Sequence, residues 1–292
     1  MENKIEYIPN RLINHNREYE NWISIDDLYM FLKSPRNYFF KKSANDLTVL
    51  NNLTKPKDLT FSLGLCIYEK IVNPVDSFKK KYIVSPKFDK RTKLGKEKYA
   101  NFMDIESIDK IIISQDDNNL IDEIITNILI NEKLYDKIIN SNFDCSVCLI
   151  DKMSGLKIKL KTDIFIKDKL IIDFKSSKDS SINSFKSEID YNNYSLTSAI
   201  YMDFLKIKEY VFISCENKAP YQMSMYSLNK KLIEQGRKDY RIALDLLKWS
   251  YDNNYWCDYI DFEILKENYF KNNLKNVMSI LSNQDKSKSY II

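Results

Sequence analysis

The chain has 292 residues, of which 44% are hydrophobic and 13% aromatic, so it is long enough to bury a full core and is excluded from the disordered class. The formal net charge of +4 excludes a strong global field, so a polyanion would have to meet a local basic patch. The sequence contains only four glycines and has neither G-x-G-x-x-G nor G-x-x-x-x-G-K-[ST], so nucleotide binding by such loops is unsupported.

The first third of the chain predicts helices. Ser24-Ile25-Asp26-Asp27 resembles a capping box, and the helix that it begins is expected to end at Ser34-Pro35. A second helix is predicted from about 58 to 72. Residues 85–99 are densely basic, which is typical either of a solvated linker or of a contact with the DNA backbone.

The middle of the chain predicts a sheet. A helical pattern over 119–140 precedes three strands at 143–150, 156–166 and 170–175. In the second strand the even positions are apolar and the odd positions are charged, as in a sheet with one buried face. A helix near 190–206, strands at 208–215 and 221–227, and helices near 229–252 and 261–282 complete the prediction.

We therefore expect an α/β fold with a mixed central β-sheet flanked by helices and with helical additions at both ends. Because no internal repeat or Pro-, Gly- or Ser-rich linker is visible, residues 1–292 are predicted to form a single domain. Its parts would be an N-terminal helical part (about 1–140), a catalytic sheet core (about 141–228) and C-terminal helices (about 229–292).

No apolar run approaches the ~20 residues that span a bilayer, and the N-terminus lacks an apolar signal region, so we expect a cytoplasmic protein that does not bind membranes. The five cysteines are scattered and the only histidine is His15. Cys145 and Cys148 are spaced like half of a metal knuckle, but without a second pair they are better interpreted as buried strand residues.

The most informative stretch runs from Lys161 to Ser177 and reads KTDIFIKDKLIIDFKSS. If its three-residue turn closes a hairpin, Asp163 and Asp173 lie opposite each other with Cβ atoms ~4.5–5.5 Å apart. Period-two alternation brings Lys175 to the same face. Facing carboxylates repel unless a cation offsets them, and hard oxygen ligands suit Mg²⁺. The pattern therefore predicts a metal-dependent phosphodiesterase site.

In this hypothesis Asp163 and Asp173 bind the metal, and Lys175 orients or deprotonates the attacking water or supports the transition-state charge. Counting back through the preceding hairpin places Asp144 roughly opposite Asp163, as a further ligand candidate. A register slip of one residue would turn Asp144 to the other face of the sheet.

From Ser24 to about Tyr259 the chain resembles the RecE-type exonuclease VIII branch of the PD-(D/E)XK (restriction-endonuclease-like) nuclease superfamily. The matching blocks are Ile23-Ser24-x-x-x-Leu28 with Ser34-Pro35-x-x-Tyr38, Leu63-Gly64-x-x-Ile67, Lys161-x-Asp163, Ile172-Asp173-Phe174-Lys175-Ser176, Tyr194 to Tyr201 and Gly236-Arg237-x-x-Tyr240.

This resemblance implies a Mg²⁺-dependent exonuclease, with Mn²⁺ as a substitute, that hydrolyses linear double-stranded DNA in the 5′→3′ direction during recombination or repair. It implies that Asp163 and Asp173 are metal ligands and that the Phe174 carbonyl reaches the metal. It also implies that Lys175 is catalytic, with Tyr201 near the site as the second catalytic candidate. Double-stranded DNA ends, a single-strand annealing protein and a homo-oligomeric ring are the implied partners.

DNA contacts are expected from Arg36, Ser176 and Tyr194. Two positions depart from the family pattern. Tyr68, beside Glu69, replaces a helix histidine of the metal site, and Thr197 replaces a glutamine four residues before Tyr201.

These departures keep a second hypothesis open, namely a non-catalytic DNA-binding module on a degenerate nuclease fold. A third is a CRISPR- or helicase-associated nuclease. It would lack an iron–sulfur cluster, because only Cys215 and Cys257 follow the core.

Overall fold

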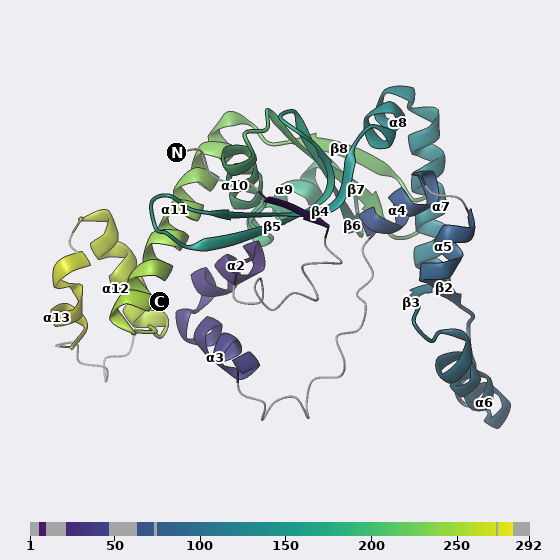
Figure 1. The fold of residues 1–292 in the computed structure, drawn as a ribbon, viewed down its shortest axis with the longest axis horizontal. Helices are drawn as coiled ribbons and strands as arrows, with labels where there is room; N and C mark the ends of the chain where they lie inside the picture. The colour runs from purple at the N-terminus through teal and green to yellow at the C-terminus, as the bar shows by residue number, and fades with distance from the viewer. Residues whose placement is uncertain (1–5, 10–21, 47–62, 73–74, 273, 283–292) are drawn as a thin grey trace.

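The computed structural model describes residues 6–9, 22–46, 63–72, 75–272 and 274–282 (Figure 1). Its centre is a mixed six-stranded sheet in the order β1-β4-β5-β6-β7-β8, in which only β6 and β7 are parallel neighbours. The strands are β1 (Glu6–Pro9), β4 (Asn142–Ile150), β5 (Lys157–Ile166), β6 (Leu170–Ser177), β7 (Glu209–Glu216) and β8 (Met223–Ser227).

The three predicted core strands are confirmed, and local turn chemistry explains their pairing. The β4–β5 loop is closed by the Asp151 side chain, whose Oδ2 accepts a 2.9 Å hydrogen bond from the Ser154 amide, and Gly155 adopts a φ of 72°. The β5–β6 loop is the predicted three-residue turn, with Asp168 at a φ of 59°. Both turns keep the strands antiparallel and in the expected register.

The parallel step from β6 to β7 requires a crossover, which α9 (Ile182–Tyr191) and α10 (Tyr194–Leu205) provide. Both helices pack on one face of the sheet together with α2 (Ile25–Lys33) and α11 (Lys230–Asn253). Gly236 permits the close approach of α11 to α10, because a Cβ at this position would lie 2.0 Å from the Ser195 carbonyl oxygen.

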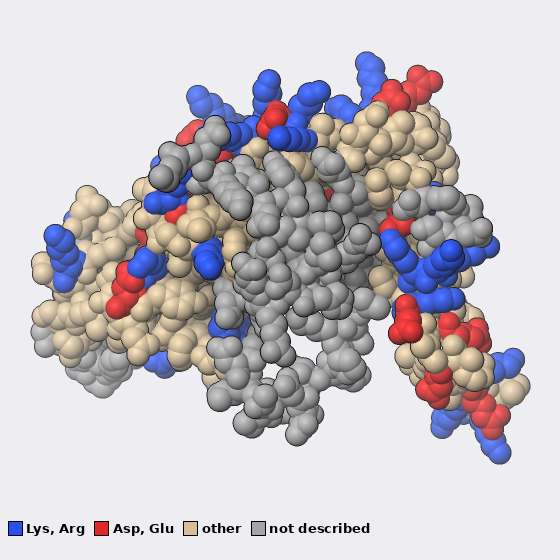
Figure 2. Space-filling model, in the orientation of Figure 1, with Lys and Arg blue, Asp and Glu red and all other residues tan. Residues whose placement is uncertain are grey.

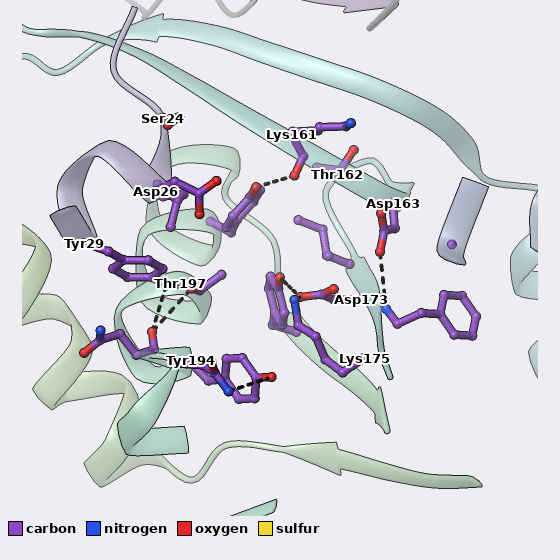
Figure 3. A pocket seen from close by; sticks show the side chains of 18 of the residues that line it. Ser24, Asp26, Tyr29, Lys161, Thr162, Asp163, Asp173, Lys175, Tyr194 and Thr197 are labelled. Atoms are coloured by element: carbon purple, nitrogen blue, oxygen red, sulfur yellow. Dashed lines mark hydrogen bonds and ion pairs between the residues drawn. The ribbon is translucent and has the colours of Figure 1, made fainter. Parts of the chain in front are cut away.

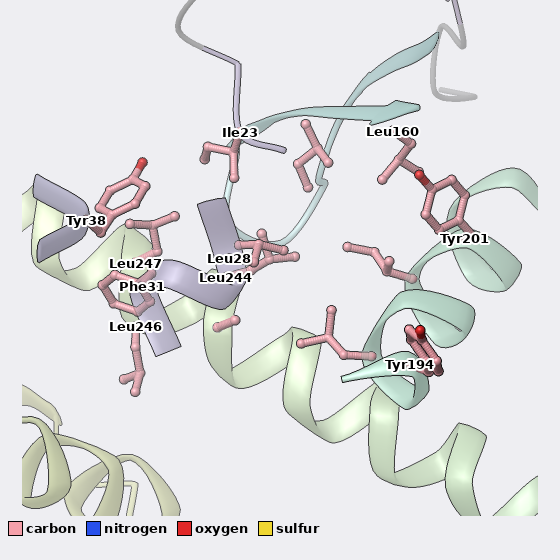
Figure 4. Close-up of a cluster of buried hydrophobic side chains, with 14 of the residues drawn as sticks. Ile23, Leu28, Phe31, Tyr38, Leu160, Tyr194, Tyr201, Leu244, Leu246 and Leu247 are labelled. Atoms are coloured by element: carbon pink, nitrogen blue, oxygen red, sulfur yellow. The ribbon is translucent and has the colours of Figure 1, made fainter. Parts of the chain in front are cut away.

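The main hydrophobic cluster lies between this face and the helices α2, α10 and α11 (Figure 4). The predicted helix start is confirmed, because Ser24 and Asp27 form a reciprocal capping box at α2. Leu28 and Phe31 then point into the core with no exposed surface. The helix α3 (Pro35–Asp46) follows and packs its Tyr38 ring against Phe31 at 5.9 Å between centroids.

A second hydrophobic cluster covers the opposite face, under α4 (Leu63–Val72), α7 (Gln115–Ile130) and α8 (Glu132–Ile139). In β5 the predicted alternation is confirmed, because the even positions Ile158, Leu160 and Ile164 are buried whereas Lys157 and Lys161 are exposed. The sheet as a whole nevertheless has both faces covered by helices. Alternation in β5 could not show this, because helices that are distant in sequence decide which faces are covered.

Residues 85–99, for which the sequence left open a solvated linker or a contact with the DNA backbone, belong to a folded arm that projects away from α4 and α7 (Figure 1). The DNA contact stays a prediction. Within the arm, Phe88 packs against the rings of Tyr99 and Phe102. Figure 2 shows basic side chains gathered beside α5 (Val75–Lys81), whose last turn carries Lys79, Lys80 and Lys81, and mixed charges over α6 (Lys93–Asn101). The arm consists of α5 (Val75–Lys81), β2 (Tyr82–Ser85), α6 (Lys93–Asn101), a π-helical turn (Phe102–Glu106) and β3 (Ile111–Ser114).

The C-terminal part is helical, as predicted, but it is divided into α12 (Tyr259–Phe270), a 3-10 turn (Leu274–Asn276) and α13 (Val277–Ser282). The strands β1, β2 and β3 within the first 140 residues were not expected from the sequence. Among the described helices, none has both the length and the apolar character needed to cross a membrane.

Candidate active site

The two acids of the hairpin meet where β5 and β6 begin to separate. The paired residues are Ile166 with Leu170, Phe165 with Ile171 and Ile164 with Ile172. The next position of this register sets Asp163 opposite Asp173, as the hairpin prediction requires. Beyond that point β6 pairs only with β7.

Where β6 no longer pairs with β5, other residues form hydrogen bonds with this edge of β5. Ile23 bridges it, because its amide donates to the Lys157 carbonyl at 2.9 Å and its carbonyl accepts from the Lys159 amide at 2.8 Å. Further along, the Tyr201 hydroxyl of α10 donates to the Lys161 carbonyl. These contacts satisfy the backbone of the diverging strand and hold α2 and α10 beside the acids.

Asp163 is held against the start of α4. Its Oδ2 accepts a 3.3 Å hydrogen bond from the Phe174 amide across the hairpin. A Cβ on Gly64 would lie 2.7 Å from the Asp163 Cγ, so only glycine allows α4 to approach this closely. Burial, reinforced by the Asp173 carboxylate, raises the pKa of Asp163 to about 7, whereas Lys175 opposes the shift.

Asp173 binds two donors through one oxygen. Its Oδ2 lies 2.8 Å from the Lys175 Nζ and accepts a 2.8 Å hydrogen bond from the Tyr210 hydroxyl (Figure 3). Burial alone would lower the pKa of Lys175, but the ion pair with Asp173 outweighs it and holds that pKa above its usual value. Lys175 is therefore a charged donor in this arrangement. Burial, reinforced by the Asp173 charge, keeps the pKa of Tyr210 well above normal, so its hydroxyl stays protonated.

The acids and Lys175 lie in a cavity of about 790 Å³ between the sheet, α2 and the α9–α10 junction (Figure 3). Lysine side chains and exposed aromatic surface also line this cavity. Tyr191, which is 80% exposed, and Lys33, whose Nζ lies 6.0 Å from the centre of that ring, both belong to its lining. Lys159 and Lys161 line it as well. Acids inside a cavity with cationic groups in its wall suit a phosphodiester substrate.

Several lining residues were missed from the sequence. Tyr210 is the second residue of β7, and Tyr29 of α2 forms hydrogen bonds with Thr197 and with the Asn193 carbonyl. Asp26, in the first turn of α2, adds an exposed carboxylate. The capping box located the start of α2, but no sequence signal placed that helix beside the acids.

The remaining predicted residues have different surroundings. Tyr194 lines the cavity with its ring 5.4 Å from the Lys175 Nζ, stacked on Phe212. Ser176 is exposed, but it does not belong to the cavity lining. Arg36 in α3 lies outside the cavity lining as well, and its guanidinium is 3.9 Å from Asp258. Among the three residues expected to contact DNA, the structure brings only Tyr194 to the acids.

The helix α4 contributes no charged side chain to the cavity. Glu69 is buried in an ion pair with Lys81, and Tyr68 packs against the second hydrophobic cluster. Asp144 belongs to β4, where its neighbours Phe143 and Cys145 pair with Ile164 and Thr162, so its backbone lies level with Asp163. The Asp144 side chain lies outside the described part of the chain.

The acids present the chemistry that a hard divalent cation needs. The Asp163 and Asp173 carboxylates repel each other, and Lys175 forms an ion pair with Asp173. Phe174 lies between Asp173 and Lys175 in the chain. In the described residues no group of three or more His, Cys, Asp or Glu side chains could hold a metal ion. Backbone carbonyls, water and substrate oxygens are ligands that Mg²⁺ commonly takes in addition to one or two carboxylates.

The family model and the first of the two solved structures below agree with the fold. Residues 73–279 match the family model described as a PDDEXK-like domain of unknown function (DUF3799). No curated protein matches the chain. A solved structure from Eubacterium rectale, named a "putative exonuclease", is similar with a TM-score of 0.50 and 11% identity, over 97% of this chain and 96% of that one. A phage-related exonuclease from Haemophilus somnus 129PT has a TM-score of 0.32 and 13% identity, over 70% of this chain and all of that one.

Proposed function

Because the chain belongs to the PDDEXK-like domain family, we propose that it is a metal-dependent deoxyribonuclease of the PD-(D/E)XK superfamily. The observation that carries the proposal is the meeting of Asp163, Asp173 and Lys175 at the point where β5 and β6 diverge. Within that superfamily we propose exonuclease action on linear double-stranded DNA. The 5′→3′ direction and the RecE-type branch rest on the sequence resemblance.

The residues present suit Mg²⁺, and Mn²⁺ as its substitute. Asp163 and Asp173, with the Phe174 carbonyl, are the proposed ligands. When bound, the cation would supply charge neutralisation at the phosphate and a more acidic water. Asp144 remains a proposed additional ligand.

Lys175 is proposed to act on the phosphate and the attacking water. As a protonated donor beside Asp173, its ammonium can orient the water or stabilise negative charge on the phosphate oxygens. Tyr201 is proposed to support the site and not to take part in the reaction, because its hydroxyl donates a hydrogen bond to the Lys161 carbonyl. Lys33, Lys159 and Lys161 would contact the backbone of the DNA, since phosphate contacts position the substrate without reading its sequence.

The test is digestion of end-labelled, 5′-phosphorylated linear duplex beside a closed circle, in Mg²⁺, Mn²⁺ or EDTA. We expect metal-dependent shortening of the linear DNA alone, and its loss in Lys175→Ala. Labels on either end distinguish the direction of digestion. Nicking of the circle at a comparable rate would contradict exonuclease action, and cleavage in EDTA would contradict metal dependence.

A non-catalytic DNA-binding module is the second candidate, and one observation favours it. The helix α4 presents neither an acid nor a histidine to the cavity, because Glu69 is committed to Lys81 and Tyr68 takes the histidine position. This candidate predicts DNA binding without cleavage in any metal, in which case Tyr68→His is the next variant to measure. A single-strand annealing partner, a ring assembly and a CRISPR or helicase context remain proposals from the resemblance.

A further inference from the structure

Tyr210 is a buried side-chain donor to Asp173, one of the two candidate metal ligands. It lies at the start of β7, is 5% exposed, and donates a 2.8 Å hydrogen bond to the Asp173 Oδ2, while Asp173 itself is 8% exposed. The β6–β7 register pairs Tyr210 with Ile171, two residues before Asp173 and on the same face. The tyrosine therefore reaches diagonally across the parallel strands to the carboxylate.

Both donors to Asp173 bind the same oxygen, and this fixes how the carboxylate is turned. The Lys175 Nζ lies 2.8 Å from Oδ2, the oxygen that Tyr210 also contacts. With Oδ2 held from β7 and from within β6, the carboxylate plane is set, and Oδ1 is the oxygen that receives neither of these two donors. Donors that orient a ligand in this way commonly tune metal affinity.

We propose that Tyr210 is a positioning residue that orients Asp173 for a divalent cation and holds it there while Lys175 engages the substrate. The inference rests on the proposed function, because it assigns Asp173 to the metal. Lys175 alone could not do this, because its flexible side chain is 31% exposed and has its own role at the phosphate.

The surroundings of Tyr210 make it the more rigid donor. Its ring lies 5.6 Å from that of Tyr201 and 4.9 Å from that of Phe212, within the main hydrophobic cluster. A ring packed in this way cannot rotate away when Lys175 turns from Asp173 towards a phosphate. A tyrosine has few rotatable bonds, so little conformational entropy is lost in holding the hydroxyl at Oδ2.

The variant that tests this is Tyr210→Phe, which removes one oxygen and keeps the ring. The readout is the binding of Mn²⁺ alone to the full chain, measured by calorimetry and by the electron paramagnetic resonance signal of free Mn²⁺. We expect affinity to fall by about 10- to 100-fold, the usual effect of losing such a supporting donor. The Mn²⁺ concentration for half-maximal DNA cleavage should rise in the same proportion.

Tyr240→Phe is the matched control. The Tyr240 hydroxyl donates a 2.9 Å hydrogen bond to Asp203, so the variant loses the same type of bond outside the cavity. It should retain the wild-type Mn²⁺ affinity and cleavage rate. Wild-type Mn²⁺ affinity in Tyr210→Phe, within about threefold, would overturn the inference and leave the nuclease proposal intact. Absence of Mn²⁺ binding and of cleavage in the wild-type protein would instead contradict the proposed function.

A second measurement separates positioning from general damage to the fold. In an Asp173→Asn background this ligand is already lost, so adding Tyr210→Phe should change the remaining Mn²⁺ affinity less than about twofold. A further loss as large as in the wild-type background would show that Tyr210 acts through stability, and would overturn the inference. Circular dichroism and thermal unfolding of each variant establish that binding is measured on folded protein.

Discussion

Replacing Asp163 by asparagine should stabilise the metal-free protein at alkaline pH. Burial and the Asp173 charge raise the pKa of Asp163 from its ordinary value of 3.8 to about 7. The folded state therefore binds this proton more tightly than the unfolded state does. The contribution of the protonated Asp163 to the free energy of unfolding is fully present at low pH and is lost as the pH rises from about 4 through about 7. The amide of the variant would remain neutral at every pH and would not show this loss.

The size of the effect follows from the two pKa values. At about 1.4 kcal/mol for each pH unit between 3.8 and about 7, the linkage amounts to about 4 kcal/mol in the metal-free protein above pH 7. Partial solvent access to Asp163 and relaxation of the Asp163–Asp173 pair reduce this contribution, so we expect a difference in the free energy of unfolding of roughly 2–4 kcal/mol. The asparagine Oδ1 can still accept from the Phe174 amide, so the substitution keeps the hairpin contact.

The assay is urea unfolding of both proteins in EDTA at pH 8 and at pH 4.5. Asp163→Asn should be the more stable protein by roughly 2–4 kcal/mol at pH 8, and by only about 1 kcal/mol at pH 4.5. The exposed Asp116→Asn is the control and should change stability by less than about 0.5 kcal/mol. Addition of Mg²⁺ at pH 8 should stabilise the wild type and not Asp163→Asn. Equal stability at pH 8, or a difference that does not depend on pH, would refute the reasoning.

Two further predictions concern the support of the site. Gly64→Ala should weaken Mn²⁺ binding at least about tenfold with little change in helix content, because the new methyl group would displace the Asp163 side chain. Calorimetry measures the Mn²⁺ affinity and circular dichroism the helix content. Wild-type affinity in this variant would show that α4 shifts and the Asp163 side chain does not. Tyr201→Phe should lower the free energy of unfolding by about 1 kcal/mol and leave kcat within a few-fold of the wild-type value, because the lost hydrogen bond is to the Lys161 carbonyl. A loss of kcat above about 100-fold would show that the Tyr201 hydroxyl takes part in the reaction.

The sequence by itself determined how the residues at the centre of the candidate site are arranged, because the information there is local. A three-residue turn and period-two alternation are sufficient to set Asp163 opposite Asp173 and to bring Lys175 to the same face. The capping box at Ser24 likewise fixed the start of α2. Each of these features depends on neighbours within about a dozen residues, so backbone geometry alone links sequence to position.

The tertiary structure alone decided what surrounds those residues. Tyr210 reaches Asp173 only because β7 joins β6 in parallel after a two-helix crossover, and no local pattern sets that register. Gly64 lies against Asp163, and Ile23 pairs with β5, although each is separated by about a hundred residues or more from its partner. These contacts follow from how whole helices pack on the two faces of the sheet. Such packing is decided by the burial of many apolar side chains at once.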